Sequence, residues 1–174
     1  MLETTLVVIT ADHGEELGEH GVYDHGYTLY RPALQVPLIV VAPGRPPEAR
    51  RVAAPVSLRD IPATIVDAAG VARGAPFQGT SLAFLWNRAS ETRADAPLLF
   101  EVDRVSGQPD WFPASKGDMK ALLYRGVKYI RNGDGSEELY DGEHDPWERR
   151  NLASQSEYRS IVGEYRLRLK GLVR

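Results

Sequence analysis

Two short, continuously apolar runs place the strongest constraint on how this chain folds. The runs are "TLVVIT" at residues 5–10 and "VPLIVVA" at residues 36–42, and Pro43-Gly44 closes the second. Both are rich in β-branched residues and lack polar alternation, which is typical of strands buried on both faces of a parallel sheet. Because such a sheet is covered by helices, the runs predict an α/β fold with parallel-type strands.

A helix is predicted after the second run. In "VSLRDIPATIVDAAGV", Asp60 is placed to cap the helix, Pro62 falls in its first turn and Gly70 can end it. One face of this helix carries the apolar residues Leu58, Ile61, Ile65, Val66 and Ala69. Downstream, "GTSLAFLW" predicts a short helical turn and "PLLFEV" predicts a third apolar strand.

The pattern changes in the C-terminal part of the chain. "ALLYRGVKYIRN" contains two alternating segments around Arg125-Gly126, which predicts a hairpin in a small antiparallel sheet. Residues 156–173 have apolar side chains at helical spacing, which predicts an amphipathic terminal helix. We therefore expect residues 1–96 to belong to the α/β domain, and residues 97–174 to supply a remaining strand, the antiparallel subdomain and the terminal helix.

Composition excludes several classes of protein. The 174 residues carry 21 basic and 24 acidic side chains, a net charge of −3, so neither a nucleic-acid footprint nor a polybasic membrane patch is indicated. The chain has no cysteine, which excludes disulfides and thiolate metal sites and leaves the compartment open. The apolar runs are too short to cross a bilayer, and no signal peptide follows Met1.

The first apolar run leads into a loop crowded with metal-ligand side chains. Residues 10–26 read "TADHGEELGEHGVYDHG" and hold three of the chain's four histidines. Ligands of open α/β sheets collect beyond the carboxyl ends of strands, and Asp12-His13 lies at such an end. A carboxylate oxygen suits calcium, magnesium or manganese, and an imidazole nitrogen suits zinc. The loop therefore predicts a cation site.

Two other interpretations of this loop stay open from the residues alone. Asp-His-Gly can be an ordinary turn, with the neighbouring glutamates forming a solvated acidic edge. Asp12, His13, His20 and His25 can also form a zinc cluster, although their spacing matches no common zinc pattern.

Four segments, in order along the chain, resemble the type I sulfatases of the alkaline phosphatase superfamily. They are "TLVVITADHGEELGEHG", "HGYTLYRPALQVPLIVVAPG", "VSLRDIPATIVDAAGV" with the following "FQGTSL", and "KYIRNGDGSEELYDGEHDPWERRNLA". The resemblance implies the C-terminal portion of a sulfatase-like α/β sandwich, followed by a small antiparallel sheet and a terminal helix. It also implies metal-assisted hydrolysis of a sulfate ester.

The resemblance also assigns site residues. The family's Asp followed by Asn or His, which closes a calcium site, corresponds to Asp12 and His13. The family places a Lys or His that contacts the sulfate thirteen residues after that Asp, and this position is His25. His20 matches no firm family role and is expected to order the loop.

The chain departs from the family pattern at the nucleophile. These enzymes carry a formylglycine made from a C/S-x-P-x-R motif, which the 174 residues lack, together with the strand that supplies two more metal-binding Asp residues. We expect the chain alone to be catalytically silent, and a separately encoded N-terminal half is a candidate partner. The alternatives are a phosphonate or phosphodiester hydrolase of the same superfamily, with Mn²⁺ or Zn²⁺ in place of Ca²⁺, and a non-catalytic chain that binds metal or a partner.

Overall fold

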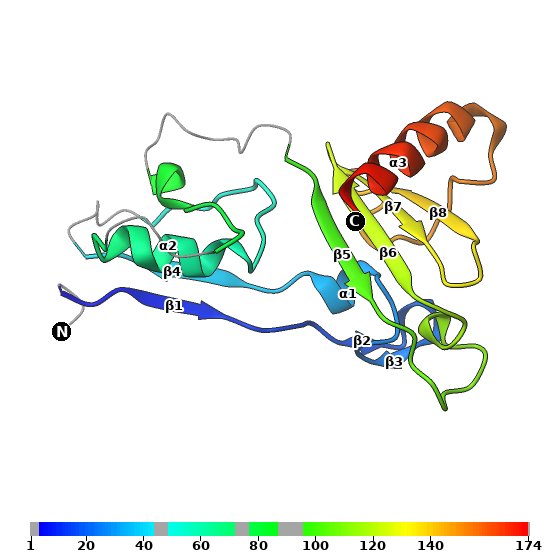
Figure 1. Ribbon diagram of the computed structural model, residues 1–174, viewed down its shortest axis with the longest axis horizontal. Coiled ribbons are helices and arrows are strands. Elements are labelled where there is room, and N and C mark those ends of the chain that lie inside the picture. The colour runs from blue at the N-terminus through cyan, green and yellow to red at the C-terminus, as the bar shows by residue number, and fades with distance from the viewer. Residues whose placement is uncertain (1–3, 44–48, 72–76, 87–95, 174) are drawn as a thin grey trace. The chain divides into compact units, whose positions relative to one another are not determined.

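The computed structural model describes residues 4–43, 49–71, 77–86 and 96–173 (Figure 1). The chain divides into two compact units. Unit 1 consists of Met1–Asp12 and Pro37–Ala96, and unit 2 consists of His13–Val36 and Pro97–Arg174. The acidic, histidine-rich loop therefore begins at the end of one unit and continues in the other.

Unit 1 is built on a pair of strands that lie within the two apolar runs. Strand β1 (Val7–Thr10) pairs with β4 (Leu38–Val41), and Ile9 lies opposite Ile39. The pairing is antiparallel, so the expected parallel-type arrangement is wrong for these two strands. An uninterrupted apolar run indicates burial. The relative direction of two strands depends on the path of the chain between them, which the run does not encode.

Helix α2 (Asp60–Ala68) forms where the sequence predicts it, but Asp60 does not cap it. Arg59 occupies the N-cap position, and Asp60 is the first helical residue. The buried Asp60 carboxylate instead accepts hydrogen bonds from the backbone N–H groups of Ser57 at 3.1 Å and Thr80 at 2.9 Å. Both carboxylate oxygens of Asp60 accept hydrogen bonds from N–H groups outside α2. Asp60 therefore links the start of α2 to the segment around Thr80.

The other local predictions for unit 1 are confirmed. Gly70 has a φ of 67° directly after α2, the left-handed conformation that favours glycine at a helix end. The expected short helical turn is a 3₁₀ helix at Ala83–Trp86. Both features are local, so turn chemistry alone was enough to predict them.

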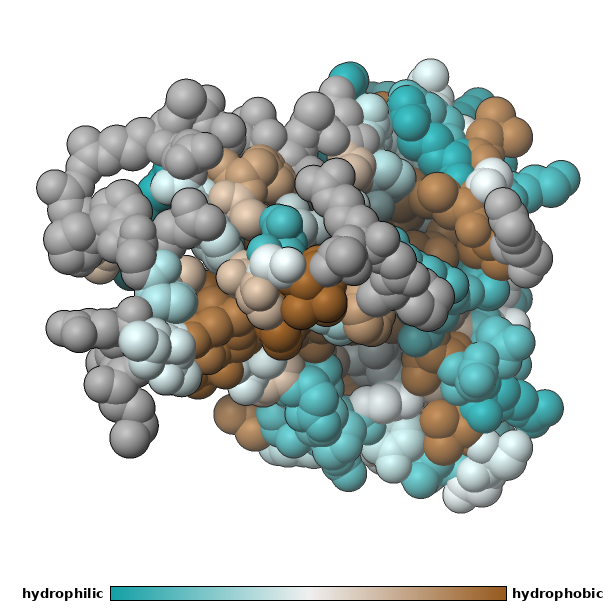
Figure 2. Space-filling view, turned by 60° about the vertical axis from the view of Figure 1, so that its left-hand side comes forward, coloured by the Kyte–Doolittle hydropathy of each residue, from teal (hydrophilic) through white to brown (hydrophobic). Residues whose placement is uncertain are grey.

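One face of the β1–β4 pair exposes large apolar side chains. Ile9 and Ile39 are each 53% exposed, and Val41 is 41% exposed. Figure 2 shows apolar side chains at the surface on the side of the molecule that comes forward. A groove of about 400 Å³ in the same unit is lined by Thr4, Leu6, Val8, Pro43, Ile65, Ala68 and Ala69. Isolated strands with such faces are normally covered by further structure.

Unit 2 begins with a small hairpin and a short helix. Strand β2 (Glu16–Leu17) pairs antiparallel with β3 (Tyr23–Asp24), and a 3₁₀ turn at Glu19–Gly21 lies between them. Helix α1 (Arg31–Leu34) follows, with Tyr30 at its N-cap. This hairpin carries most of the acidic, histidine-rich loop.

A four-stranded antiparallel sheet forms the centre of unit 2. Its strands run in the order β5 (Leu98–Val102), β6 (Met119–Tyr124), β7 (Val127–Arg131) and β8 (Glu137–Asp141). Between β6 and β7, Arg125 and Gly126 have φ values of 48° and 76°, which a two-residue hairpin turn of type I′ requires. The predicted hairpin is therefore confirmed, and the third apolar strand belongs to this antiparallel sheet.

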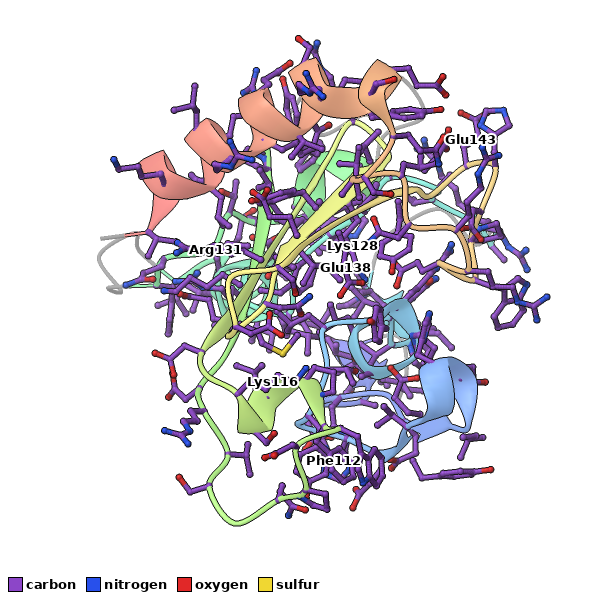
Figure 3. The ribbon with its side chains drawn as sticks, turned by 90° about the vertical axis from the view of Figure 1, so that its right-hand side faces the viewer. Phe112, Lys116, Lys128, Arg131, Glu138 and Glu143 are labelled. Atoms are coloured by element: carbon purple, nitrogen blue, oxygen red, sulfur yellow. The ribbon has the colours of Figure 1, made fainter. Side chains whose placement is uncertain are left out.

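The two faces of this sheet bury different partners. Helix α3 (Arg159–Leu172) packs on one face in a core of Leu122, Tyr124, Tyr129, Leu139, Leu152, Val162, Tyr165 and Leu169. The opposite face packs against the segment 13–36 through Leu29, Ala114, Met119, Ala121, Ile130 and Tyr140. Figure 3 shows the sheet between α3 and the blue N-terminal segment. The histidine-bearing segment is thus seated on a well-packed sheet.

Among the described residues, no helix combines the length and the apolar character that crossing a membrane requires.

Candidate functional site

The loop after β1 folds back onto helix α1 through its backbone. The N–H of Gly14 donates to the carbonyl of Ala33 at 2.8 Å, and the N–H of Glu15 donates to the carbonyl of Pro32 at 3.1 Å. A Cβ atom at position 14 would lie 1.9 Å from the Pro32 oxygen. Only glycine fits this close approach, which explains the glycine directly after Asp12-His13.

Two of the three predicted site residues come together in this loop. The imidazoles of His13 and His25 stack, with ring centroids 3.7 Å apart and an interplanar angle of 18°. Nδ1 of His25 lies 3.0 Å from Asp24 Oδ1 and 3.3 Å from Glu15 Oε2. His13, Glu15 and His25 each offer a ligand atom, and these atoms all lie within 4.8 Å of one another. The segment 13–25 thus gathers two imidazoles and two carboxylates.

The third predicted residue, Asp12, precedes this cluster directly in the chain. It is exposed and is the last residue of the N-terminal segment of unit 1, and a peptide bond joins it to His13. The side chains of His13, Glu15 and His25 are exposed as well. Each of these side chains therefore faces solvent in the described part of the chain.

The donor set is suited to a divalent cation. Carboxylate oxygens and imidazole nitrogens are the side-chain ligands that Zn²⁺ and Mn²⁺ accept, whereas Ca²⁺ takes six to eight oxygens. Asp12, which directly precedes His13 in the chain, offers a further carboxylate. The residues thus fit part of a divalent-metal site, and a calcium ion would need more oxygen ligands than these side chains provide.

His20 lies outside the cluster and orders the loop, as expected. Its ring stacks on Tyr30 at 3.7 Å, and Nε2 lies 3.0 Å from the carbonyl oxygen of Glu148. Nδ1 lies 3.8 Å from Oε2 of the fully buried Glu16, and the His20 side chain is 14% exposed. Glu16 also accepts a hydrogen bond from the hydroxyl of Thr28 at 2.8 Å. These contacts hold the middle of the loop against Tyr30 and Glu148 of unit 2.

The contacts of His20 predict that loop stability depends on pH. Burial lowers the pKa of His20, but hydrogen bonds and charges from Glu16 and Glu148 outweigh it, so the pKa is raised above the ordinary value of about 6.5. The resulting stabilisation is complete below about pH 6.5 and is lost as the pH rises through the folded-state pKa. The Tm difference between the wild type and His20→Gln is expected to shrink accordingly from about pH 5 to about pH 9.

His144 provides the matched control for this pH series. Its imidazole, with 78% of the side chain exposed, pairs with Asp141 at 2.9 Å. Because exposed pairs contribute little to stability, His144→Gln is expected to change Tm much less. A Tm difference for His20→Gln that stays constant across the pH series would contradict the role given to His20.

Sequence reasoning missed three residues around the site. Glu15 was grouped with a solvated acidic edge, yet it reaches His25. Lys128, on strand β7, and Glu148 form a buried ion pair, with 2.6 Å between Nζ and Oε1. A lysine between the apolar Val127 and Tyr129 of a predicted strand was the available signal, because a buried lysine requires an acidic partner.

Comparison with known proteins places the chain in a family. The family model described as "N-sulphoglucosamine sulphohydrolase, C-terminal" matches residues 18–174. The chain is 31% identical over 166 residues to the Delta 4,5-hexuronate-2-O-sulfatase of Bacteroides thetaiotaomicron, covering 93% of this chain and 33% of that protein. It is 31% identical over 164 residues to arylsulfatase K of Mus musculus, covering 89% of this chain and 28% of that protein. The chain spans about a third of the length of these relatives.

Solved structures also match this chain. A 2-O GAG sulfatase matches with a TM-score of 0.78 and 26% identity, covering 96% of this chain and 35% of that chain. A phosphonate monoester hydrolase from Silicibacter pomeroyi matches with a TM-score of 0.75 and 27% identity, covering 96% of this chain and 34% of that chain. The sulfatase resemblance and the fold class expected from the sequence are confirmed, and sulfatases generally depend on a divalent metal. The chain belongs to the sulfatase family.

Proposed function

We propose that this chain supplies the C-terminal part of the active site of a sulfatase, a metal-assisted hydrolase of sulfate esters. The observation that carries the proposal is the stacking of His13 on His25 beside Glu15, in the loop after the first strand of a sulfatase-family chain. His13 and His25 are thereby close enough to act on one ligand. Asp12 and His13 would hold a divalent cation, and His25 would contact the sulfate.

The proposed role of His25 follows from its neighbours. Nδ1 faces Asp24 and Glu15, so a proton on this nitrogen is shared with their carboxylates. When the ring is an imidazolium, Nε2 also carries a proton and can donate a hydrogen bond to a sulfuryl oxygen or to the leaving oxygen. A donor placed where negative charge develops stabilises the transition state.

We propose calcium as the resident cation. When bound, a divalent cation polarises the sulfuryl oxygens and so favours attack at sulfur. Asp12 and His13 would be its ligands from this chain, and further oxygen ligands would come from other residues of the complete enzyme. Metal analysis of the purified gene product is expected to find calcium. Mn²⁺ or Zn²⁺, which also accept imidazole nitrogen, is the cation expected instead if the diesterase alternative holds.

A second candidate activity is the hydrolysis of phosphonate or phosphodiester substrates. A phosphonate monoester hydrolase is among the similar structures, at an identity close to that of the 2-O GAG sulfatase. Phosphoryl and sulfuryl groups both present oxygens to a cation and a histidine, so the same loop residues suit either substrate. We place sulfate ester hydrolysis first because the family model and both curated relatives named above are sulfatases.

The test is a comparison of two substrates with the gene product isolated from its source cells. In calcium-containing buffer, kcat/KM is expected to be higher for 4-nitrophenyl sulfate than for bis(4-nitrophenyl) phosphate, and EDTA should abolish both reactions. A preference for the diester would overturn the sulfatase assignment. Metal binding without hydrolysis of either compound would favour the non-catalytic alternative.

The exposed strand face suggests a structural partner for unit 1. Ile9, Ile39 and Val41 present apolar surface that would gain stability if another part of a sulfatase fold covered it. We propose that such a part, in the same chain or separately encoded, packs there. Co-expression with the N-terminal two thirds of a sulfatase is expected to yield a complex that Ile39→Lys weakens.

A further inference from the structure

The position of the His13–His25 loop depends on helix α1. The backbone N–H groups of Gly14 and Glu15 donate to carbonyls of Pro32 and Ala33, which lie within α1. Any displacement of α1 would therefore carry the loop with it. Whatever holds α1 in place also sets the positions of the two stacked imidazoles.

Glu148 holds the N-terminal end of α1. Its Oε2 accepts a hydrogen bond from the backbone N–H of Arg31, the first residue of the helix, at 2.8 Å. Its Oε1 lies 2.6 Å from Nζ of Lys128 on strand β7, and the two side chains are 4% and 6% exposed. One buried carboxylate thus joins the helix to the sheet.

The same residue also holds the middle of the loop. The carbonyl oxygen of Glu148 lies 3.0 Å from Nε2 of His20. The φ of Glu148 is 54°, an unusual left-handed conformation for a residue other than glycine, and its N–H donates to the carbonyl of Asp145 at 3.0 Å. Strained backbone persists where the surroundings fix it, and this geometry aims both the carboxylate and the carbonyl at the loop segment.

Lys128 anchors this link in the four-stranded sheet of unit 2. Figure 3 shows Lys128 and Glu138 on the sheet near the blue N-terminal segment. Lys128 lies on the face that also carries Ile130 and Tyr140, both of which pack against that segment. Burial lowers the pKa of Lys128, while the charge and hydrogen bond of Glu148 counteract this effect. Buried ion pairs are poor sources of stability but define a unique geometry in several systems.

We propose that Glu148 is a positioning residue of the active site, which sets the place of His13 and His25 through α1 and His20. The inference rests on the proposed function, because the loop matters to catalysis only if His25 and His13 act on substrate and metal. The side-chain and carbonyl contacts of Glu148 described above go to Arg31, Lys128 and His20. Its effect is carried by the N–H of Arg31 and the ring of His20.

The test compares two substitutions at Arg31 that differ in one hydrogen bond. Arg31→Pro removes the N–H that Glu148 accepts, whereas Arg31→Ala keeps it, and both remove the same side chain. Tyr30 has φ −78° and ψ 160°, a conformation compatible with a following proline, and proline is accepted at the first helical position. In the proline variant, Cδ takes the place of the N–H and pushes the Glu148 carboxylate away from the helix, so the pair tests whether losing this contact displaces the loop.

The chain has four histidines, so the imidazole signals of the 174-residue protein are readily assigned by NMR. Arg31→Pro is expected to move the signals of His13 and His25, and Arg31→Ala to leave them in place. Methyl signals of Val162 and Leu169, in the core under α3, should be unchanged in both. In the active gene product, kcat should fall about 10- to 100-fold for Arg31→Pro relative to Arg31→Ala.

Identical His13 and His25 signals in the two variants would overturn the proposal, as would moved signals with an unchanged kcat. A wild type without sulfatase activity would refute the proposed function, and the NMR comparison would still decide whether the link holds the loop. Loss of the core methyl signals in Arg31→Pro would mean that this variant does not fold. Variants at Glu148 are then compared instead. Glu148→Gln should then preserve the loop signals, and Glu148→Leu combined with Lys128→Met should move them.

Discussion

Replacing His25 by alanine is expected to lower kcat/KM for 4-nitrophenyl sulfate by about 10²- to 10³-fold in the active gene product. This is the usual loss when one hydrogen-bond donor to a developing charge is removed. His25 stacks on His13 and is exposed, so its removal should leave the core of unit 2 intact. Steady-state kinetics with circular dichroism of the same samples would measure both effects.

His144→Ala is the matched control for this substitution. His144 is the histidine most distant in sequence from the loop, and its side chain is 78% exposed. Its activity should stay close to that of the wild type. Equal losses for His25→Ala and His144→Ala, or no loss for His25→Ala, would show that His25 does not act on the substrate.

Replacing Gly14 by alanine is expected to displace the whole loop. The added Cβ would lie 1.9 Å from the carbonyl oxygen of Pro32, a backbone atom that cannot rotate away. Overpacking of this kind typically costs about 1–3 kcal/mol of stability. A shift of about 1 Å in catalytic groups can reduce activity about 10²-fold. Thermal unfolding and kcat measured on Gly14→Ala would report both losses.

Gly171→Ala supplies the comparison. A Cβ at position 171, within α3, would meet nothing within 4 Å. Alanine favours a helix over glycine, so Tm should stay the same or rise slightly. If Gly14→Ala behaved like Gly171→Ala, the close approach of the loop to α1 would be wrong, and the stacked arrangement of His13 and His25 would lose its support.

Features fixed by local chemistry were predictable from the sequence. The turn at Arg125-Gly126 requires two positive φ values, and the end of α2 at Gly70 requires one, so short sequence signals were sufficient. The amphipathic pattern placed α3 correctly because its buried residues recur at helical spacing. The family resemblance added the fold class, which periodicity alone does not specify.

Features fixed by long-range contacts were not predictable. The antiparallel direction of β1 and β4 depends on the path of the chain between them, which an apolar run does not encode. The grouping of residues 13–36 with the C-terminal sheet depends on packing against residues such as Ile130 and Tyr140. Asp60 was expected to act within its own helix, whereas Thr80, twenty positions later, supplies one of its partners.

The roles of Asp12, His13 and His25 stay predictions. The place of Asp12 and His13 after a strand pointed to a cation site, the family resemblance supplied the roles of all three residues, and stacking of the two imidazoles was not foreseen. Glu148 was missed because the signal for its role, a lysine inside a strand far along the chain, has meaning only once the sheet is seen to bury it. The role of a buried charge is recognised from its partner, and Lys128 and Glu148 lie twenty positions apart in the sequence.

The most direct test of the central claim is a Mn²⁺ titration of the 174-residue chain, followed by NMR of its four histidine rings. Mn²⁺ is a paramagnetic substitute for the proposed cation, and line broadening detects even weak binding. We expect the signals of His13 and His25 to broaden first, well before that of the exposed His144, which pairs with Asp141. Broadening of His144 before or together with His13 and His25 would contradict a metal site in the loop.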